Sequence, residues 1–267
     1  MPRQRVGDIE IYYEVHGVGP RTLVMIRGLG SNLLSWYEQI EVLAQHYRCV
    51  VFDNRGAGRT DKPDAPYSIK GMADDTAGLM DALGITRAAL MGISMGGMIA
   101  QEFALHHPEK LACLILGCTP FGGASVAQSP PEIVAAVMAG TNATPAQQHQ
   151  QLQAVFCDDT IENRREVVEK HNRIRAQYPI PPYAFMRQIQ AIGAFDASAR
   201  LGQIRVPTMV IAGREDRLVA PQNSKMIAER ISGSKLVELP GGHLFMAEYP
   251  EEFNRAVIDF VDAHELG

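Results

Sequence analysis

Short runs of apolar residues recur along the chain, and stretches with helical spacing separate them. The apolar runs lie at residues 22–26, 49–52, 88–91, 111–116, 208–212 and 236–239. Uninterrupted runs of this length are typical of strands that are buried on both faces of a sheet. Residues 8–15 alternate between apolar and polar side chains instead, which predicts a half-buried antiparallel strand at the edge of the sheet.

Helices are predicted between these strands. Ser35 and Glu38 form a candidate capping box, which would open a helix that ends near residue 46. Residues 69–83 carry apolar side chains at helical spacing, and Pro250 would open the last helix. Strands that alternate with helices predict an α/β fold, in which a mostly parallel sheet is flanked by helices on both faces.

The alternation breaks between residues 120 and 195, where helical patterns continue without any buried-strand run. Prolines divide this stretch into four expected helices. One follows Pro131 and one follows Pro145, and the other two span residues 161–177 and 182–192. A disordered insertion is the alternative, but the apolar content of the stretch argues against it.

We therefore predict three parts along the chain. Residues 1–119 form the first part of an α/β core, residues 120–195 form an inserted helical cap, and residues 196–267 complete the core. The chain of 267 residues is long enough for one large core, since single α/β domains often reach about 200–250 residues.

A glycine-rich turn follows the apolar run at residues 88–91. It places Gly92, Ser94 and Gly96 in the pattern G-x-S-x-G, and an apolar helical pattern continues to Leu105. In such a turn the serine projects from the sheet at the N-terminus of the helix, where unpaired N–H groups stabilise negative charge. A chance turn is the alternative, but the strand before it and the helix after it favour a nucleophile.

A serine hydroxyl needs a neighbouring base before it becomes an effective nucleophile. His243 follows the last apolar run, and Asp216 follows the run before it. Parallel strands bring their carboxyl ends to one rim, so these three side chains can meet. Their order along the chain is serine, acid, histidine, as in other sites built on such a turn. Glu215 is the alternative acid, but the G-x-x-D spacing from Gly213 at the end of the preceding strand favours Asp216.

An acyl-transfer site also needs donors for the oxyanion of its tetrahedral intermediate. The residue after the nucleophile, Met95, is expected to supply one backbone N–H group. The loop after the first buried strand is expected to supply the other, and we assign that donor to Leu29.

Composition narrows the classes of protein. The 267 residues are 46% hydrophobic and 21% charged, with a formal net charge of −5, which argues against a nucleic-acid partner. No cysteine or histidine spacing typical of a metal site occurs, and no cofactor is expected. The cysteines are scattered, which predicts buried free thiols in a reducing cytoplasm; they are Cys49, Cys113, Cys118 and Cys157.

The N-terminal residues include no long apolar segment, and no stretch approaches 18 uninterrupted apolar residues. We therefore expect no secretory signal, no membrane-spanning helix and no membrane partner. The expected location is cytoplasmic. The oligomeric state stays open, with a homodimer among the alternatives.

At these motifs the chain resembles the α/β-hydrolase superfamily, specifically its capped branch of esterases, lactonases and C–C hydrolases. The matching segments are R-G-L-G at residues 27–30, D-N-R-G-A-G-R-T at 53–60, G-I-S-M-G-G at 92–97, G-R-E-D at 213–216 and G-H at 242–243. Residues 67–69 and 94–98 are also similar to 3-oxoadipate enol-lactonases. Two positions depart from the family pattern: Arg27 stands where a histidine is frequent, and Thr60 stands in place of a serine.

The resemblance implies an eight-stranded sheet and hydrolysis of a small, partly apolar ester or lactone through an acyl-enzyme. It implies that Ser94 attacks, that His243 moves the proton and that Asp216 orients the imidazole. Four further side chains are candidates for contact with the substrate, each with ordinary packing or a surface ion pair as the alternative; they are Arg27, Trp36, Phe121 and Met186.

Other functions use the same residues. A C–C bond hydrolase and a cofactor-free perhydrolase would both keep the serine, histidine and acid, so the sequence leaves them open. A ligand-binding or signalling protein on this scaffold is a third alternative. A serine at position 94 excludes the haloalkane dehalogenase and epoxide hydrolase activities, because the nucleophile in those families is an aspartate.

Overall fold

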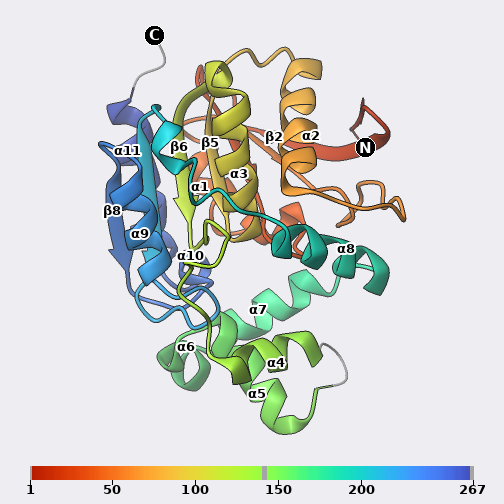
Figure 1. The fold of residues 1–267 in the computed structure, drawn as a ribbon, viewed down its shortest axis with the longest axis vertical. Coiled ribbons are helices and arrows are strands. Elements are labelled where there is room, and N and C mark those ends of the chain that lie inside the picture. The colour runs from red at the N-terminus through yellow and green to blue at the C-terminus, as the bar shows by residue number, and fades with distance from the viewer. Residues whose placement is uncertain (1, 140–142, 265–267) are drawn as a thin grey trace.

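A single eight-stranded sheet forms the centre of the protein (Figure 1). The computed structural model describes residues 2–139 and 143–264. The strand order is β1-β2-β4-β3-β5-β6-β7-β8; β2 pairs antiparallel with β1 and β4, and β3 to β8 pair in parallel. The strands are β1 (Arg3–Val6), β2 (Ile9–His16), β3 (Thr22–Ile26), β4 (Arg48–Phe52), β5 (Ala88–Ile93), β6 (Leu111–Gly117), β7 (Thr208–Gly213) and β8 (Lys235–Leu239). The predicted α/β class with a mostly parallel sheet is confirmed.

The edge of the sheet differs from the prediction. The strand expected at residues 8–15 is β2, but β1 pairs with its outer side, so β2 lies one place inward. Hydrophobic patterning misses β1 because its four residues, R-Q-R-V, are only exposed or half-buried and contain no apolar run. A strand with one solvated face and one free edge needs little apolar surface.

Two apolar clusters cover the two faces of the sheet. Residues such as Ile26 and Leu90 pack toward α2 (Ile69–Ala82), α3 (Met95–His106) and α9 (Gln222–Arg230). Met25 and Met91 pack toward η1 (Leu33–Trp36), α1 (Ile40–Leu43), α10 (Phe245–Glu248) and α11 (Pro250–Ala263). Successive strand residues therefore alternate between the two clusters, as the period of a strand requires. Two short 3₁₀ helices, η2 (Pro108–Lys110) and η4 (Leu201–Gln203), precede β6 and β7.

The capping box predicted at Ser35 and Glu38 is wrong. The chain forms the short 3₁₀ helix η1 and then the one-turn helix α1, and the N-cap of η1 is Asn32, whose side chain accepts a hydrogen bond from the N–H of Leu34. The buried Asp53 carboxylate accepts from the N–H of Leu33 at 2.7 Å. A long-range partner therefore fixes this turn, and the local spacing of Ser35 and Glu38 does not.

The described residues between β6 and β7 form five α-helices. They are α4 (Pro131–Ala139), α5 (Pro145–Val155), α6 (Asp158–Asn163), α7 (Arg165–Arg175) and α8 (Pro182–Gly193). In Figure 1, α4 to α7 gather beyond one end of the strands, and α8 lies closer to the sheet. The single helix expected at residues 161–177 is wrong, because the backbone leaves the helical conformation at Arg164 and divides it into α6 and α7.

This helical segment starts and ends at neighbouring points. Gly122 and Asp196 form an isolated antiparallel bridge, so the chain leaves the core and returns to it side by side. The boundaries predicted at residues 120 and 195 stay predictions. No helix in the described ranges is long and apolar enough to cross a membrane.

Candidate active site

Ser94 lies in a strained turn between β5 and α3. Its backbone adopts φ 59° and ψ −124°, a conformation that a residue with a side chain rarely takes. Two glycines make the turn sterically feasible. A Cβ atom on Gly92 would lie 2.1 Å from the carbonyl oxygen of Gly96, and one on Gly96 would lie 2.3 Å from the carbonyl oxygen of Ile26. The G-x-S-x-G spacing thus reflects close approach of three backbone segments.

The loop after β3 packs directly against this serine. A Cβ atom on Gly28 would lie 2.9 Å from Cβ of Ser94 and 3.3 Å from its Oγ atom. On the other side, the N–H of Ser94 donates to the carbonyl of Gly117, at the end of β6, at 2.9 Å. Ser94 therefore lies between the ends of β3 and β6.

His243 and Asp216 form a buried pair at the ends of β8 and β7. The Nδ1 atom of His243 lies 2.8 Å from Oδ2 of Asp216, and both residues are about 5% exposed or less. The other carboxylate oxygen of Asp216 accepts from the N–H groups of Leu218 and Val219, each at 2.8 Å. Glu215, the alternative acid, is exposed.

The electrostatics of this pair favour a charged histidine. Burial by itself lowers the pKa of His243, but the adjacent Asp216 carboxylate raises it, and the net result is a pKa well above the usual 6.5. Such an imidazole binds a proton readily and is stabilised once it holds one. That property suits a general base whose protonated form must persist until a leaving group takes the proton.

Cys118, at the end of β6, lies beside this pair. Its Sγ atom, a ring nitrogen of His243 and a carboxylate oxygen of Asp216 all lie within 4.8 Å of one another. Hydrogen bonds already engage the three residues: the carboxylate holds the imidazole and two backbone N–H groups, and the thiol donates to the carbonyl of His243 at 3.5 Å. This bonding fits an oriented histidine better than a metal site. Sequence reasoning treated Cys118 only as a scattered thiol.

The two predicted oxyanion donors both flank Ser94. Met95 is the first residue of α3, where backbone N–H groups have no acceptor within the helix. Leu29 follows Gly28 in the loop that touches the serine. Within the described ranges, neither N–H group donates to another protein atom.

Two buried polar side chains support these loops, and sequence reasoning missed both. Gln188 of α8 accepts from the N–H of Gly30 and donates to the carbonyl of Arg55, both at 2.9 Å. Glu248 of α10 accepts from the N–H of Gly242, beside the histidine, and from that of Cys157. Both tie the helical segment or the end of β8 to the rim of the sheet. Neither lies in a motif, so only the tertiary structure identifies them.

Arg27 and Trp36 are brought together. Arg27 is 3% exposed, and its guanidinium carbon lies 4.7 Å from the ring centroid of Trp36, which is a cation–π contact. Burial lowers the pKa of Arg27 to about 10, so it keeps its charge at neutral pH. Its Nε and Nη1 atoms have no hydrogen-bond partner among the described residues.

The other two substrate candidates lie apart from this pair. Phe121 is buried in the apolar cluster on the opposite face of the sheet, under the guanidinium of Arg230 at 4.8 Å. Met186 of α8 is 42% exposed. Its neighbour Phe185 instead comes within 3.5 Å of the position that a Cβ atom on Gly30 would occupy. The roles of Phe121 and Met186 in substrate binding stay predictions.

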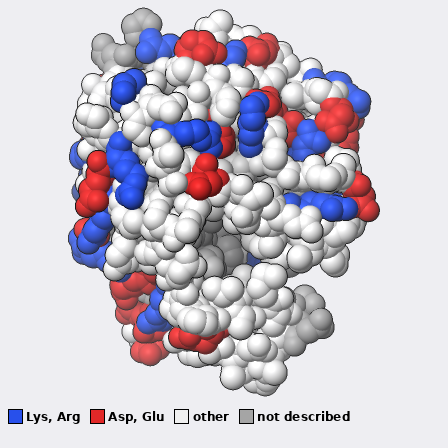
Figure 2. All heavy atoms as spheres, in the orientation of Figure 1, with Lys and Arg blue, Asp and Glu red and all other residues white. Residues whose placement is uncertain are grey.

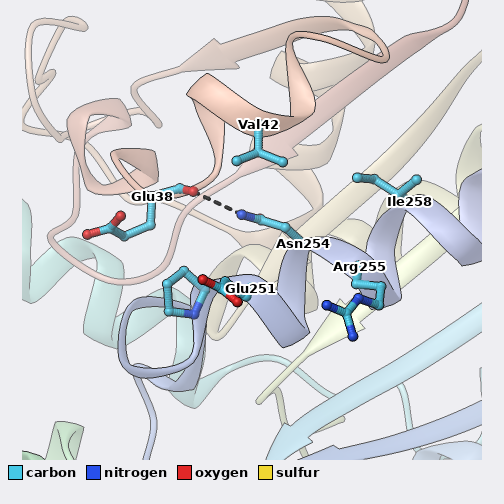
Figure 3. Close-up of a pocket in the computed structure, with 7 residues that line it drawn as sticks. Glu38, Val42, Glu251, Asn254, Arg255 and Ile258 are labelled. Atoms are coloured by element: carbon cyan, nitrogen blue, oxygen red, sulfur yellow. Dashed lines mark hydrogen bonds between the residues drawn. The ribbon is translucent and has the colours of Figure 1, made fainter.

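The surface is hollowed between the lobe that contains α4 and α5 and the rest of the molecule, and few charged side chains border the hollow (Figure 2). A separate groove of about 470 Å³ lies between α1 and α11 (Figure 3). It contains neither a serine nor a histidine, so it does not qualify as the active site. Its lining residues are Glu38, Val42, Pro250, Glu251, Asn254, Arg255 and Ile258.

The sheet, the strained serine turn and the acid–histidine pair together define a hydrolase of the α/β class. The family model described as "alpha/beta hydrolase fold" matches residues 21–250, and the chain belongs to this family. The resemblance inferred from the motifs is therefore confirmed.

Several members of this family are similar along their whole length. "Putative carbamate hydrolase RutD" from Azorhizobium caulinodans is 30% identical over 97% of this chain and 98% of the relative. "3-oxoadipate enol-lactonase 2" from Acinetobacter baylyi is 32% identical over 94% of this chain and 92% of the relative. The solved structure of the enol-lactonase from Burkholderia xenovorans LB400 superposes with a TM-score of 0.84 at 29% identity, covering 97% of this chain and 99% of that one.

Proposed function

We propose that this protein is a serine hydrolase that cleaves a carboxylic ester or lactone of a small, partly apolar substrate. The observation that carries the proposal is the buried hydrogen bond between His243 and Asp216 at the rim of the sheet where Ser94 occupies its strained turn. The similarity to relatives named as an enol-lactonase and a carbamate hydrolase supports attack on an acyl carbon.

In the first half of the reaction, the Oγ atom of Ser94 attacks the acyl carbon while His243 takes its proton. The tetrahedral intermediate places its negative charge where the N–H groups of Leu29 and Met95 donate. Asp216 stabilises the imidazolium that forms. The intermediate then collapses, the bond to the leaving oxygen breaks, and His243 returns the proton to that oxygen.

In the second half, water attacks the acyl-enzyme in the same way. His243 takes a proton from the water, and the hydroxide adds to the acyl carbon. The second intermediate expels the Oγ atom of Ser94, which regains its proton from the imidazolium. The carboxylic acid product leaves, and the protein returns to its starting state without any cofactor.

Labelling with a fluorophosphonate tests the nucleophile. We expect mass spectrometry of the intact wild-type protein to show one added phosphonyl group, and we expect the Ser94→Ala and His243→Ala variants to show none. Ser35→Ala is a suitable control, because Ser35 is a buried serine of η1 that is not part of the strained turn, and its loss should leave labelling unchanged.

The labelling result, followed by activity assays, separates this proposal from the alternatives. Labelling at Ser94 justifies assays with p-nitrophenyl esters, lactones and dienoates, whose relative rates distinguish an ester or lactone hydrolase from a C–C hydrolase. Added hydrogen peroxide would reveal a perhydrolase. If well-folded wild-type protein is not labelled, the hydrolase proposal fails and a ligand-binding role on this scaffold takes its place.

A further inference from the structure

Arg27 is a buried cation without a counter-ion. Its side chain forms no ion pair and no hydrogen bond with any residue in the described ranges, although it is 97% buried. The ionisable groups whose charge affects the pKa of Arg27 are the thiol of Cys118 and the hydroxyl of Tyr37, and neither is a carboxylate. Removing an arginine from water without a partner costs several kcal/mol, so buried arginines are normally paired.

The titratable groups near Arg27 supply no negative charge to balance it. Burial and the charge of Arg27, with that of Arg175, lower the pKa of His171 to about 3, so this imidazole is neutral and supplies no anion. The hydroxyl of Tyr37 is also buried without a hydrogen-bond partner. Burial raises the pKa of Tyr37 to about 12, so it remains a neutral donor. Arg27 and Tyr37 therefore both carry buried hydrogen-bond donors that have no acceptor among the described residues.

The site adjoins the reacting atoms. Arg27 immediately precedes Gly28, which contacts Ser94, and its carbonyl is fixed by a hydrogen bond from the side chain of Asn54 at 2.8 Å. Strand alternation directs its side chain to the face of the sheet that holds Met25, where Cys118 lies beside His243 and Asp216. The guanidinium therefore lies on the same face of the sheet as Cys118, whose charge affects its pKa, but it does not bond to His243 or Asp216.

We propose that Arg27 and the hydroxyl of Tyr37 bind a carboxylate of the substrate, so that the preferred substrate is an ester or lactone that carries a second, ionised carboxyl group. The inference that the bound carboxylate belongs to a substrate rests on the proposed function, but binding of an anion at Arg27 can be tested without that function. Stacking on Trp36 holds the guanidinium in place while leaving its Nε and Nη1 donors unused.

Binding to an inactive protein tests the site independently of catalysis. We expect calorimetry with Ser94→Ala to detect glutarate, and we expect glutaramide, which is neutral and of similar shape, to bind at least tenfold more weakly. Adding Arg27→Met should weaken glutarate binding by on the order of 100-fold, because one partner of a buried charge pair is lost. Equal binding of the acid and the amide would overturn the inference.

Kinetics with matched esters test the same site during turnover. The p-nitrophenyl monoester of glutaric acid and p-nitrophenyl valerate have acyl chains of equal length, and only the first carries a carboxylate. In the wild type, kcat/KM should favour the glutarate ester. Arg27→Met should lower the ratio of the two kcat/KM values, glutarate ester over valerate, by at least about tenfold, and Arg27→Lys should restore part of that ratio.

Arg21→Met provides a matched control. Arg21 also stacks on an aromatic ring, that of Tyr47 at 5.3 Å, but it pairs with Asp262 and precedes β3, so it lies at the opposite end of this strand from Arg27. This variant should keep the preference for the anionic ester. Should Arg27→Met fail to fold, competition by glutarate and glutaramide against valerate hydrolysis in the wild type gives the same decision.

The outcomes separate the two proposals. If both esters are hydrolysed at Ser94 with no dependence on Arg27, the anion site is wrong and the hydrolase proposal stands. If no ester is hydrolysed but glutarate binds through Arg27, the hydrolase proposal fails and the anion site stands.

Discussion

Ser94 combines a nucleophilic hydroxyl with a backbone conformation that only a tightly packed glycine environment permits. The strain of a non-glycine residue at positive φ is of the order of 1–3 kcal/mol, and the surrounding contacts must offset it. Cys118 is the only other described non-glycine residue at positive φ, and it too lies beside His243. Both unusual conformations therefore occur at the candidate active site.

Gly96→Ala tests whether this packing holds the turn. The added methyl group would lie 2.3 Å from the carbonyl oxygen of Ile26, a backbone atom that cannot move away easily. We expect a loss of at least about 2 kcal/mol in the free energy of unfolding, measured with urea, and a loss of fluorophosphonate labelling.

Gly193→Ala is the control for that substitution. Gly193 ends α8, and no atom lies within 4 Å of its added Cβ position. The free energy of unfolding should stay the same or rise by a few tenths of a kcal/mol. Equal stability of the two variants would show that the G-x-S-x-G turn does not depend on close backbone approach.

The pH profile follows from the raised pKa of His243. The imidazole must be neutral to accept the proton of Ser94, so kcat/KM for p-nitrophenyl valerate should rise with pH through an apparent pKa above 6.5. Asp216→Asn removes the charge that raises this pKa, and it should move the midpoint down while reducing kcat by up to about 10⁴-fold. A midpoint below 6.5 in the wild type would contradict the charge arrangement at this pair.

At the scale of elements, α8 connects the helical segment to two loops of the core. The side chain of Gln188 satisfies both the N–H of Gly30 and the carbonyl of Arg55, so the loop beside Ser94 depends on a helix far away in the sequence. Phe185 and Ile180 cover the same loop at Gly30. The helical segment thus contributes to the shape of the site as well as covering it.

Gln188→Met tests this connection. The variant keeps the side-chain volume but leaves two half-buried backbone groups without this partner, which should lower the free energy of unfolding by about 1 kcal/mol. Because one of them belongs to the loop with the Leu29 donor, kcat should fall more than KM changes. Gln190→Met, an exposed position on the same helix, should leave stability and kcat unchanged. A result in which both variants behave alike would remove Gln188 from the support of the site.

At the scale of the whole molecule, the four cysteines report on how the fold opens. All four are free and buried. Cys49 and Cys113 lie in central strands, whereas Cys157 caps the start of α6 in the helical segment. The segment and the sheet therefore carry separate thiol probes.

We expect a thiol-reactive dye to modify none of the four rapidly in the native protein and all four in guanidinium chloride. Cys157 should react first at intermediate denaturant, because local opening requires less free energy than global unfolding. Cys157→Ala should remove this early phase, and Cys113→Ala should retain it. Immediate reaction of one thiol in the native state would contradict the buried arrangement.

Local spacing in the sequence was sufficient for much of the fold. Buried strands appear as apolar runs and the serine turn appears as G-x-S-x-G, because both depend on neighbours within a few residues. Strand β1 and the cap of η1 were missed, since an edge pairing and the carboxylate of Asp53 determine them. The break at Arg164 was also invisible to helical periodicity.

The sequence by itself determined the class of fold, the order of the buried strands along the chain and the candidate nucleophile and histidine, because each of these shows in spacing over a few residues. Only the tertiary structure decided that Asp216 rather than Glu215 bonds to His243, that Cys118 lies beside them, and that Arg27 is buried without a counter-ion. These features join residues from different strands. Their contacts depend on strand order and packing across the sheet, which local periodicity does not encode.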